Sequence, residues 1–270
     1  MAFRVAFIHD VFCDTEGDER LRALLGEAKD AGAKLALLPE LPLNDWAPAS
    51  RRVRDEDAEE PEGPRHRRLA EAAQTAGIAL LGGAIVRDPA SGRRFNRALL
   101  FDAAGKLLAG YDKCHLPSEE GFWESDHYEP GDEPARPIEG LEMVAGIQIC
   151  SDCNRPEGSH LLGARGAEFI VCPRATPTAS YERWLLVFRA NALTSCTYIL
   201  SPNRPHGESG VEIGGPSVAV APDGTVLLES TEPLAVVDLE REAVESARRL
   251  YPGYLSVRAG LYARAWSELS

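Results

Sequence analysis

Short apolar runs alternate with longer amphipathic stretches along the whole chain. Apolar runs bounded by turn residues predict buried strands, and apolar residues at helical spacing predict helices that pack on them. The first pair shows the pattern, because the mainly apolar run Phe3–Ile8 precedes an amphipathic stretch, Glu19–Ala31, that ends before Gly32. Gly at this position is typical of a helix end.

The same two patterns recur to the end of the chain. They predict further strands at Leu35–Leu38, Ile78–Val86, Arg97–Asp102, Lys106–Tyr111, Met143–Ile149, Phe169–Cys172, Thr197–Leu200, Ser217–Ala221, Thr225–Glu229 and Leu234–Leu239. They predict helices at Arg65–Ala76, Pro156–Arg165 and Tyr181–Leu193, and a charged helix after the last strand. The turns at 102–105 and 222–224 are short, so the strands around each are expected to be antiparallel.

The chain has 270 residues and shows no internal repeat, low-complexity tract or linker. We therefore expect one domain, 1–270, in the α/β class, with sheets covered by helices. A chain of this size buries roughly 70–75% of the surface that it exposes when unfolded, so it needs no disulfide bonds or structural metal to be stable.

Composition excludes several classes of function. A net charge of −13 argues against nucleic-acid binding, which favours a basic surface. No apolar run reaches the roughly 18 residues of a membrane span, and the first residues lack the basic start of a signal peptide. Six scattered cysteines then predict free thiols in a reducing compartment, the cytoplasm. The acidic stretch Asp55–Glu62 is expected to be a solvated loop.

Two polar residues follow predicted strands in positions that suit catalysis. Glu40 lies between prolines just after an apolar run, where burial would raise its pKa and favour a general base. Lys113 follows the strand 106–111 and could stabilise an oxyanion. Taken alone, each position is also compatible with a solvated surface residue, and nearby His115 with a structural hydrogen bond.

Cys150 ends the apolar run 143–149, and a predicted helix begins a few residues later. This strand-to-helix elbow is the geometry that exposes a nucleophile, and helix N-terminal amides would lower the thiol pKa. The alternative is a buried structural cysteine, the role expected of Cys172 and Cys196.

Cys150 and Cys153 also form a C-x-x-C pair. A structural zinc site needs a second pair of ligands, which the sequence lacks, so we expect no metal. Oxidation of Cys150 to a sulfenic acid would allow Cys153 to form a disulfide that reductant reverses. Alternatively, Cys153 points into the core and never meets Cys150.

The ordered set of these segments resembles the carbon–nitrogen hydrolase family, also called the nitrilase superfamily, over nearly the whole chain. The motifs that carry the resemblance are Pro39-Glu40, Lys113-Cys-His-Leu116, Glu124-Ser125, Pro130-Gly-Asp132, Cys150 to Pro156-Glu157, Arg165-Gly-Ala-Glu168, Gly215-Pro-Ser217 and Pro222-Asp-Gly224. The resemblance implies a four-layer α-β-β-α sandwich that dimerises, or forms a higher homo-oligomer, through its α faces. It also implies a Glu40–Lys113–Cys150 triad without metal or organic cofactor.

The resemblance implies further site residues. A second glutamate supports the triad in the family, and the Pro130-Gly-Asp132 anchor favours Glu124, with Glu120 as the alternative. The backbone N–H of Ser151 would join Lys113 in stabilising the oxyanion, and Trp123 would line the pocket.

Three arginines follow predicted strands: Arg155, Arg174 and Arg204. An arginine in such a position, Arg174 first among them, would clamp a substrate carboxylate, although a surface salt bridge is equally compatible with the sequence.

The expected activity is hydrolysis of a small amide or N-carbamoyl compound through a Cys150 thioester, with release of ammonia. Asn154 stands where many members of the family have arginine after the nucleophile, so the substrate stays open. The alternatives are a nitrilase that acts on a nitrile and a non-catalytic member that serves as a binding protein.

Overall fold

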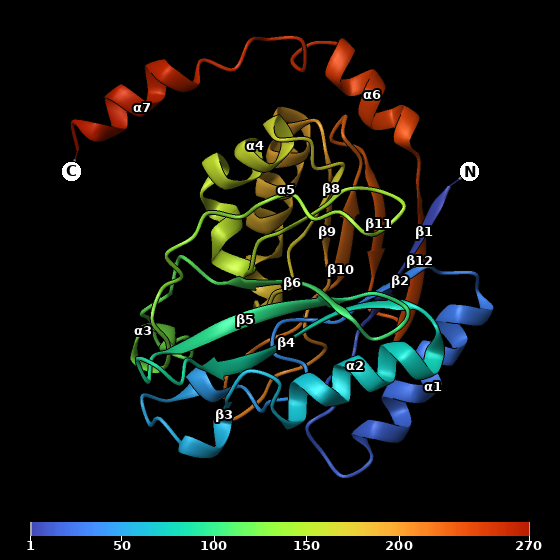
Figure 1. Ribbon diagram of the computed structural model, residues 1–270, viewed down its shortest axis with the longest axis vertical. Helices are drawn as coiled ribbons and strands as arrows, with labels where there is room; N and C mark the ends of the chain where they lie inside the picture. Colours follow the sequence, from blue (N-terminus) through green and yellow to red (C-terminus); the bar gives the residue numbers. More distant parts are fainter. Residues whose placement is uncertain (1, 270) are drawn as a thin grey trace.

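The computed structural model describes residues 2–269, which form two β-sheets packed between helices (Figure 1). The first sheet has the strand order β12 (Leu234–Leu239), β1 (Phe3–Ile8), β2 (Leu35–Leu37), β4 (Ala79–Arg87), β5 (Arg94–Phe101) and β6 (Leu107–Asp112), and β3 (Ala58–Glu59) pairs with β4. The second has the order β11 (Val226–Ser230), β10 (Ser217–Val220), β9 (Tyr198–Ser201), β8 (Phe169–Val171) and β7 (Ala145–Ile147).

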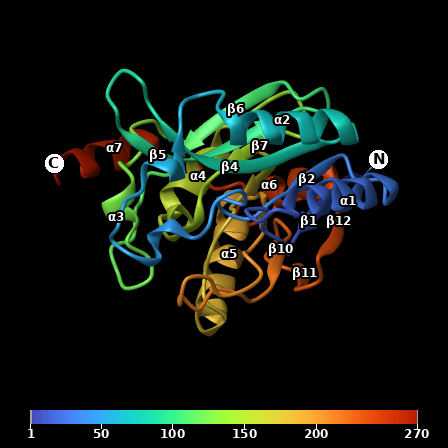
Figure 2. The same cartoon turned by 90° about the horizontal axis from the view of Figure 1, so that it is seen from below.

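Helices cover the outer face of each sheet. Helices α1 (Gly17–Asp30) and α2 (Pro64–Ala76) pack on the first sheet, and α4 (Pro156–Ala164) and α5 (Tyr181–Ser195) pack on the second (Figures 1 and 2). The short helix α3 (Glu124–His127) lies in the connection between the sheets. The predicted four-layer α-β-β-α sandwich is confirmed.

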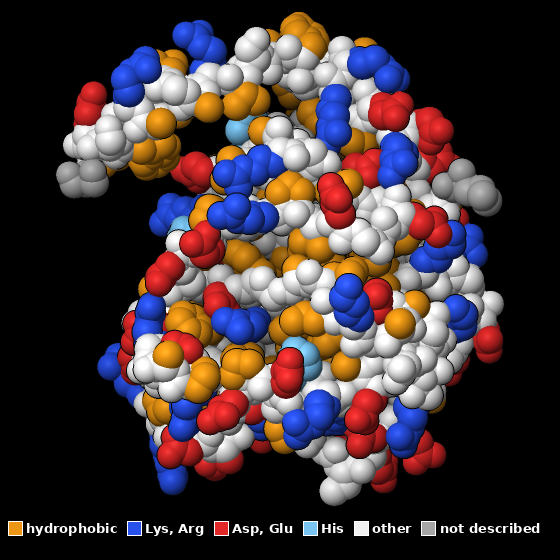
Figure 3. Space-filling model, in the orientation of Figure 1, with side chains coloured by type: hydrophobic (Ala, Val, Ile, Leu, Met, Phe, Trp, Pro, Cys, Tyr) orange, Lys and Arg blue, Asp and Glu red, His pale blue; other side chains and the backbone are white. Residues whose placement is uncertain are grey.

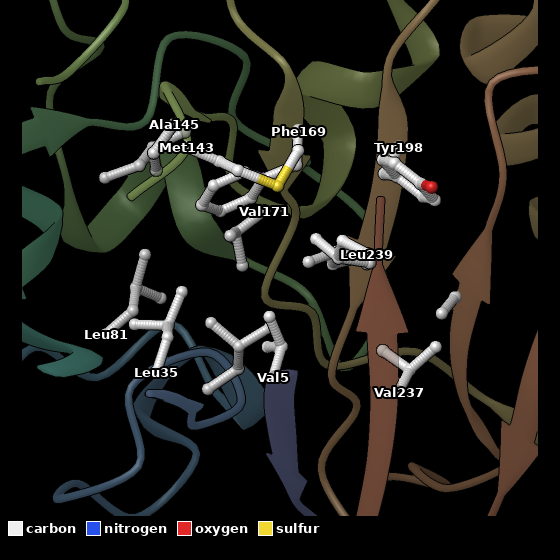
Figure 4. Packing of buried hydrophobic residues seen from close by; sticks show 14 of the residues in the cluster. Val5, Leu35, Leu81, Met143, Ala145, Phe169, Val171, Tyr198, Val237 and Leu239 are labelled. Carbon is white, nitrogen blue, oxygen red and sulfur yellow. The ribbon is translucent and has the colours of Figure 1, made fainter. Parts of the chain in front are cut away.

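The alternation of side chains along the strands explains the layers. In β1, Val5 and Phe7 belong to the cluster between the two sheets, while Ala6 and Ile8 belong to the cluster under α1 and α2. Figure 4 shows Val5 of the first sheet facing Val171 of the second across this central layer. Both faces of these strands are therefore buried, which explains why the sequence shows them as nearly continuous apolar runs.

Strand directions bring distant segments to one edge of the molecule. Strands β1, β2 and β4 are parallel, and β6 runs in the same direction because β5 is antiparallel to both of its neighbours. Strands β7, β8 and β9 are also parallel. In such sheets functional residues collect beyond the carboxyl ends of the strands. Glu40, Lys113 and Cys150 follow β2, β6 and β7 in this way.

Every predicted strand and internal helix is present, with ends that differ by a few residues, and both predicted hairpins are antiparallel. Strand β7 is shorter than the predicted strand 143–149 by two residues at each end. Beyond it, the N–H groups of Gln148 and Cys150 still donate to the carbonyls of Val171 and Pro173, while the N–H of Ile149 donates to the carboxylate of Asp152.

The acidic stretch Asp55–Glu62 is not simply a solvated loop, so that prediction is wrong. The carboxylate of Asp57 is buried and pairs with Arg54 at 2.8 Å. The carboxylate of Glu59 accepts hydrogen bonds from the N–H groups of Arg65 and His66 in the first turn of α2. The two carboxylates thus accept hydrogen bonds from donors that would otherwise lack a partner, including N–H groups at the start of α2. The sequence pattern alone does not show these contacts.

The C-terminal end forms two helices where the sequence predicted one. Helix α6 (Arg241–Arg249) is the predicted charged helix, and α7 (Ala259–Ser267) follows it on an arm that arches away from the body (Figure 1). No helix within residues 2–269 is long and apolar enough to cross a bilayer.

Gly163 marks a close approach of α4 to α5, since a Cβ atom there would collide with the carbonyl of Ser195. We expect Gly163→Ala to lower the free energy of unfolding by about 1–3 kcal/mol, the usual cost of overpacking. Gly26→Ala in α1 is the matched control, because a Cβ there meets nothing within 4 Å. In this control the free energy of unfolding should rise by about 0.5–1 kcal/mol, because alanine has a higher helix propensity than glycine. Urea unfolding measures both, and equal stability of the two variants would contradict the close approach.

Candidate active site

Glu40 projects from the turn after β2 and is only 2% exposed. Its Oε1 accepts hydrogen bonds from Nζ of Lys113 and Nδ2 of Asn96, both at 2.8 Å. Its Oε2 is buried and has no hydrogen-bond partner among residues 2–269. A buried carboxylate oxygen without a donor is costly, so Oε2 is well suited to accept a proton from a group that enters the site.

Lys113 is fully buried between two carboxylates. Its ammonium group donates to Glu40 at 2.8 Å and to both oxygens of Glu124 at 2.6 and 2.7 Å. Burial alone lowers the pKa of Lys113, but the carboxylates of Glu124 and Glu40 outweigh it and raise the pKa well above the usual value. Lys113 therefore carries a fixed positive charge within the protein interior.

Glu124 is the second carboxylate of this cluster and begins α3, where it is fully buried. Burial and the charge of Glu40 raise the pKa of Glu124 to about 7, although Lys113 lowers it. Glu120, the alternative from the sequence, is exposed in the preceding turn. Of the two glutamates, Glu124 lies against Lys113.

Cys150 sits at a sharp elbow between β7 and the 3₁₀ helix Cys150–Asn154. Its φ angle is 45°, a left-handed conformation that costs a non-glycine residue about 1–3 kcal/mol and is typical of functional sites. Its N–H donates to the carbonyl of Pro173 at 3.0 Å, which fixes the turn against the end of β8.

The expected low pKa of Cys150 is wrong for this structure. Burial, and then the charge of Glu40, raise the pKa of the thiol well above its usual value, and Lys113 offsets only part of this. The thiol is 5% exposed, so water stabilises a thiolate poorly. Cys150 therefore keeps its proton at rest and needs a base to become a nucleophile.

Two residues that the sequence analysis missed hold the site together. Asn96, buried in β5, donates to Glu40, and its carbonyl accepts the N–H of Lys113 at 3.0 Å. Asp152 accepts hydrogen bonds from the N–H groups of Cys114 and His115 and from the Nδ1 of His115. In β5, Asn96 stands between Phe95 and Arg97, so the sequence pattern gave no clear signal for it.

Asp152 also accepts hydrogen bonds from the hydroxyl of Tyr111 at 2.9 Å and the N–H of Ile149 at 3.0 Å. It therefore joins the segment that carries Lys113 to the elbow that carries Cys150. Ser151 adds a second link, because its hydroxyl donates to the carbonyl of His115. His115 has the structural hydrogen-bonding role that the sequence favoured.

Trp123 is not part of the apolar cluster beside Glu40. The guanidinium of exposed Arg51 lies 3.8 Å from the centre of its ring, which places Trp123 near the surface. The apolar cluster that contains Leu41 instead includes the buried rings of Trp46 and Tyr128. Sequence proximity to Glu124 was a poor guide, because α3 turns the adjacent side chain outward.

The arginine predicted to clamp a substrate has protein partners instead. Arg174 is 1% exposed, and its guanidinium donates to Ser201, Thr176 and the carbonyl of Pro216. Burial lowers its pKa to about 10. Arg204 is also buried and bonded to the protein, whereas Arg155 is exposed near the surface depression beside Ser151.

Cys153 lies in the core cluster under α4 and α5, with Cys172, where its thiol faces the side-chain oxygen of Gln148 at 3.7 Å. This arrangement favours the alternative in which Cys153 packs in the core over a role as partner of Cys150. Within residues 2–269, no group of three or more His, Cys, Asp or Glu residues is placed to hold a metal ion.

Comparison with known proteins places this geometry in a wider context. The model of the family described as carbon–nitrogen hydrolase matches residues 14–249. The chain is similar to omega-amidase NIT2 of Homo sapiens, with 31% identity over 97% of both chains. The fold is similar to that of a carbon–nitrogen hydrolase from Helicobacter pylori G27, with a TM-score of 0.86, 21% identity and coverage of 98% and 99%. At 21% identity, the similarity to the Helicobacter pylori protein concerns the fold alone.

A third relative is an amidase from Nesterenkonia sp. AN1, which has 26% identity, a TM-score of 0.79 and coverage of 98% and 97% in one of its solved structures. That structure is a variant with the acetamide moiety of fluoroacetamide bound covalently to the active-site cysteine. Another variant of the same amidase was solved in complex with butyramide.

Removal of the ammonium should leave two buried carboxylates facing each other. We expect Lys113→Met to lower the free energy of unfolding by about 3–5 kcal/mol near neutral pH. Burial and Glu40 raise the pKa of Glu124, and the variant loses Lys113, the charged neighbour that lowers it. A raised pKa gives stability that is present at acid pH and lost as the pH rises.

The loss in Lys113→Met should therefore be smaller near about pH 5 than near about pH 8. Urea unfolding at both pH values measures this difference. The double variant Lys113→Met/Glu124→Gln should recover part of the loss at the higher pH, because one carboxylate is gone. An equal loss at both pH values, with no recovery, would contradict the buried charge cluster.

Proposed function

The chain belongs to the carbon–nitrogen hydrolase family, and on that premise we propose that Cys150, Glu40 and Lys113 hydrolyse the C–N bond of a small amide or N-carbamoyl compound. The observation that carries this proposal is geometric: a buried, strained Cys150 lies in the same site as Glu40, which has one unpaired oxygen, and Lys113, which is held between two carboxylates. General base, nucleophile and electrostatic stabiliser are the groups that acyl transfer needs.

The first half of the reaction forms a thioester. Glu40 takes the proton of the Cys150 thiol, and the sulfur attacks the carbonyl carbon of the substrate. Lys113 and the N–H of Ser151 stabilise the negative charge that develops on the carbonyl oxygen, and one such donor is typically worth ~3–4 kcal/mol. Glu40 then gives the proton to the leaving nitrogen, the C–N bond breaks, and ammonia departs.

The second half regenerates the thiol. Glu40 takes a proton from water, and the hydroxide attacks the thioester carbonyl. The C–S bond breaks, the proton returns to sulfur, and the carboxylic acid leaves. Glu124 acts through Lys113, because its two hydrogen bonds fix the ammonium beside Glu40.

The comparisons support an amide over a nitrile, since relatives similar along nearly their whole length are named as amidases. The complete charge cluster argues against a non-catalytic member, because a binding protein has no need of two carboxylates and an ammonium buried beside a thiol. N-carbamoyl compounds stay within the proposal, since their reacting carbonyl is also bonded to nitrogen.

We also propose a cytoplasmic location and a homodimer. All six cysteines are free thiols, which supports a reducing compartment. Helix α5 exposes Leu186 to 72%, and the arm beyond α6 carries further exposed apolar side chains, which a second copy would cover. Figure 3 shows these apolar atoms along the arm, and a cleft of about 540 Å³ separates the arm from α4 and α5.

The catalytic proposal is tested by ammonia release from a panel of small amides, ureido acids and nitriles. Cys150→Ala should abolish turnover with an unchanged circular dichroism spectrum, because only the nucleophile is lost. Glu40→Gln and Lys113→Ala should each lower kcat by at least about 10²-fold, since both groups act in the transition state. Substantial activity in Cys150→Ala would end the covalent mechanism, and a change in KM alone would refute the role of either partner.

The dimer is tested by light scattering during gel filtration, where the protein should show twice the chain mass of 29.3 kDa. Leu186→Asp should shift it towards the monomer, because a charge would then be buried in the interface. Leu107→Asp on β6 is the control, because Leu107 is also exposed but lies on the other sheet. A monomeric wild-type protein would refute the proposed dimer.

A further inference from the structure

Arg204 connects the second sheet to the turn that carries Glu40. It follows β9, and its side chain is fully buried. Its Nη1 donates to the carbonyls of Glu40 and Leu41, both at 2.8 Å, and its Nη2 donates to the carbonyl of Asn44 at 3.0 Å. Its Nε and Nη2 also donate to Glu208, at 2.9 and 2.6 Å. These contacts occupy the whole guanidinium group.

The turn that Arg204 holds is strained. Leu41 has a φ angle of 48°, in the left-handed region that branched side chains seldom adopt. The N–H of Asn44 closes the turn by donating to the carbonyl of Leu41 at 3.1 Å. Such a conformation persists only when its surroundings over-determine it. Arg204 does so, because it bonds the carbonyls of Glu40 and Leu41 on both sides of the strained peptide.

Glu208 extends these contacts towards Glu124. Its carboxylate accepts the N–H of Trp46 at 3.1 Å, and the indole N–H of Trp46 donates to the carbonyl of Gly121 at 2.9 Å. Gly121 lies in the segment just before Glu124. One chain of hydrogen bonds thus links Arg204 to the segments on which both glutamates sit.

From this geometry we propose that Arg204 is a positioning residue, which fixes the backbone of Glu40 so that its carboxylate meets both Lys113 and the Cys150 thiol. The proposal rests on the catalytic function given above. Arg204 does not clamp a substrate carboxylate, since its N–H groups are already bonded within the protein. Lysine is a poor substitute here, because one ammonium cannot match the planar fork that reaches three carbonyls and a carboxylate.

The experiment compares Arg204→Lys and Arg204→Ala with the wild-type protein. A small displacement of a catalytic base costs on the order of 10²-fold in rate, so kcat should fall about 10²-fold in Arg204→Ala and less in Arg204→Lys. KM should stay within about threefold, because the substrate loses no contact. Guanidinium ion, which fits the space that Arg204→Ala leaves, should restore part of kcat.

Arg241→Lys is the control for the loss of an arginine–carboxylate pair, at a site where the arginine side chain is 52% exposed. Arg241 also makes a bonded pair with a carboxylate, Glu168, but on α6 and without contact to the Glu40 turn. This variant should keep the kcat of the wild type. A fall in kcat as large as that of Arg204→Lys would show that any lost ion pair lowers activity, and it would overturn the positioning role.

Crystal structures of the Arg204 variants separate this proposal from the catalytic one. In Arg204→Ala the carboxylate of Glu40 should move out of hydrogen-bond distance of the Lys113 ammonium. This result can be obtained without knowing the substrate. If the contact of 2.8 Å and the left-handed Leu41 survive in Arg204→Ala, the positioning role is wrong. A wild-type protein that releases no ammonia would instead refute the catalytic proposal, and the crystal structures would still decide the role of Arg204.

Discussion

The buried contact between Lys113 and its two glutamates is the interaction on which the site depends. An isolated charge in the protein interior is strongly unfavourable, so three charges coexist there only because each has partners at hydrogen-bond distance. Burial, and then the charge of Glu40, raise the pKa of the neighbouring Cys150 thiol well above its usual value. A single arrangement thus explains both the resting state of Cys150 and the presence of a base beside it.

The fold was largely predictable because most strands are buried on both faces. Apolar runs such as Phe3–Ile8 and Phe169–Val171 must lie in strands that are covered on both faces. The order of strands and helices then favours a sandwich. The grouping of Glu40, Lys113 and Glu124 was also predictable, since each belongs to a motif whose order in the chain is characteristic of the family.

Other features depend on contacts between residues far apart in sequence, which single-residue patterns do not encode. The sequence shows only that an arginine follows a strand, and this position is compatible both with binding a substrate carboxylate and with binding backbone carbonyls. It therefore could not show that Arg174 and Arg204 bind the protein instead of a substrate. The pKa of Cys150 was misjudged for a related reason. Helix geometry was visible in the sequence, whereas burial of the thiol and the nearby carboxylates were not.

The four side chains of the site are each no more than 5% exposed, and this closure has consequences for the timing of the reaction. Side chains with so little contact with solvent leave bulk water little access to a thioester on Cys150. In the proposed mechanism, ammonia must leave before the hydrolytic water takes its place, because the same base, Glu40, exchanges a proton with each. If ammonia lingers, it can attack the thioester and reform the amide, so the exit route influences the net direction of flux. The burial of these four side chains thus bears on the order of the steps as well as on the reactivity of each group.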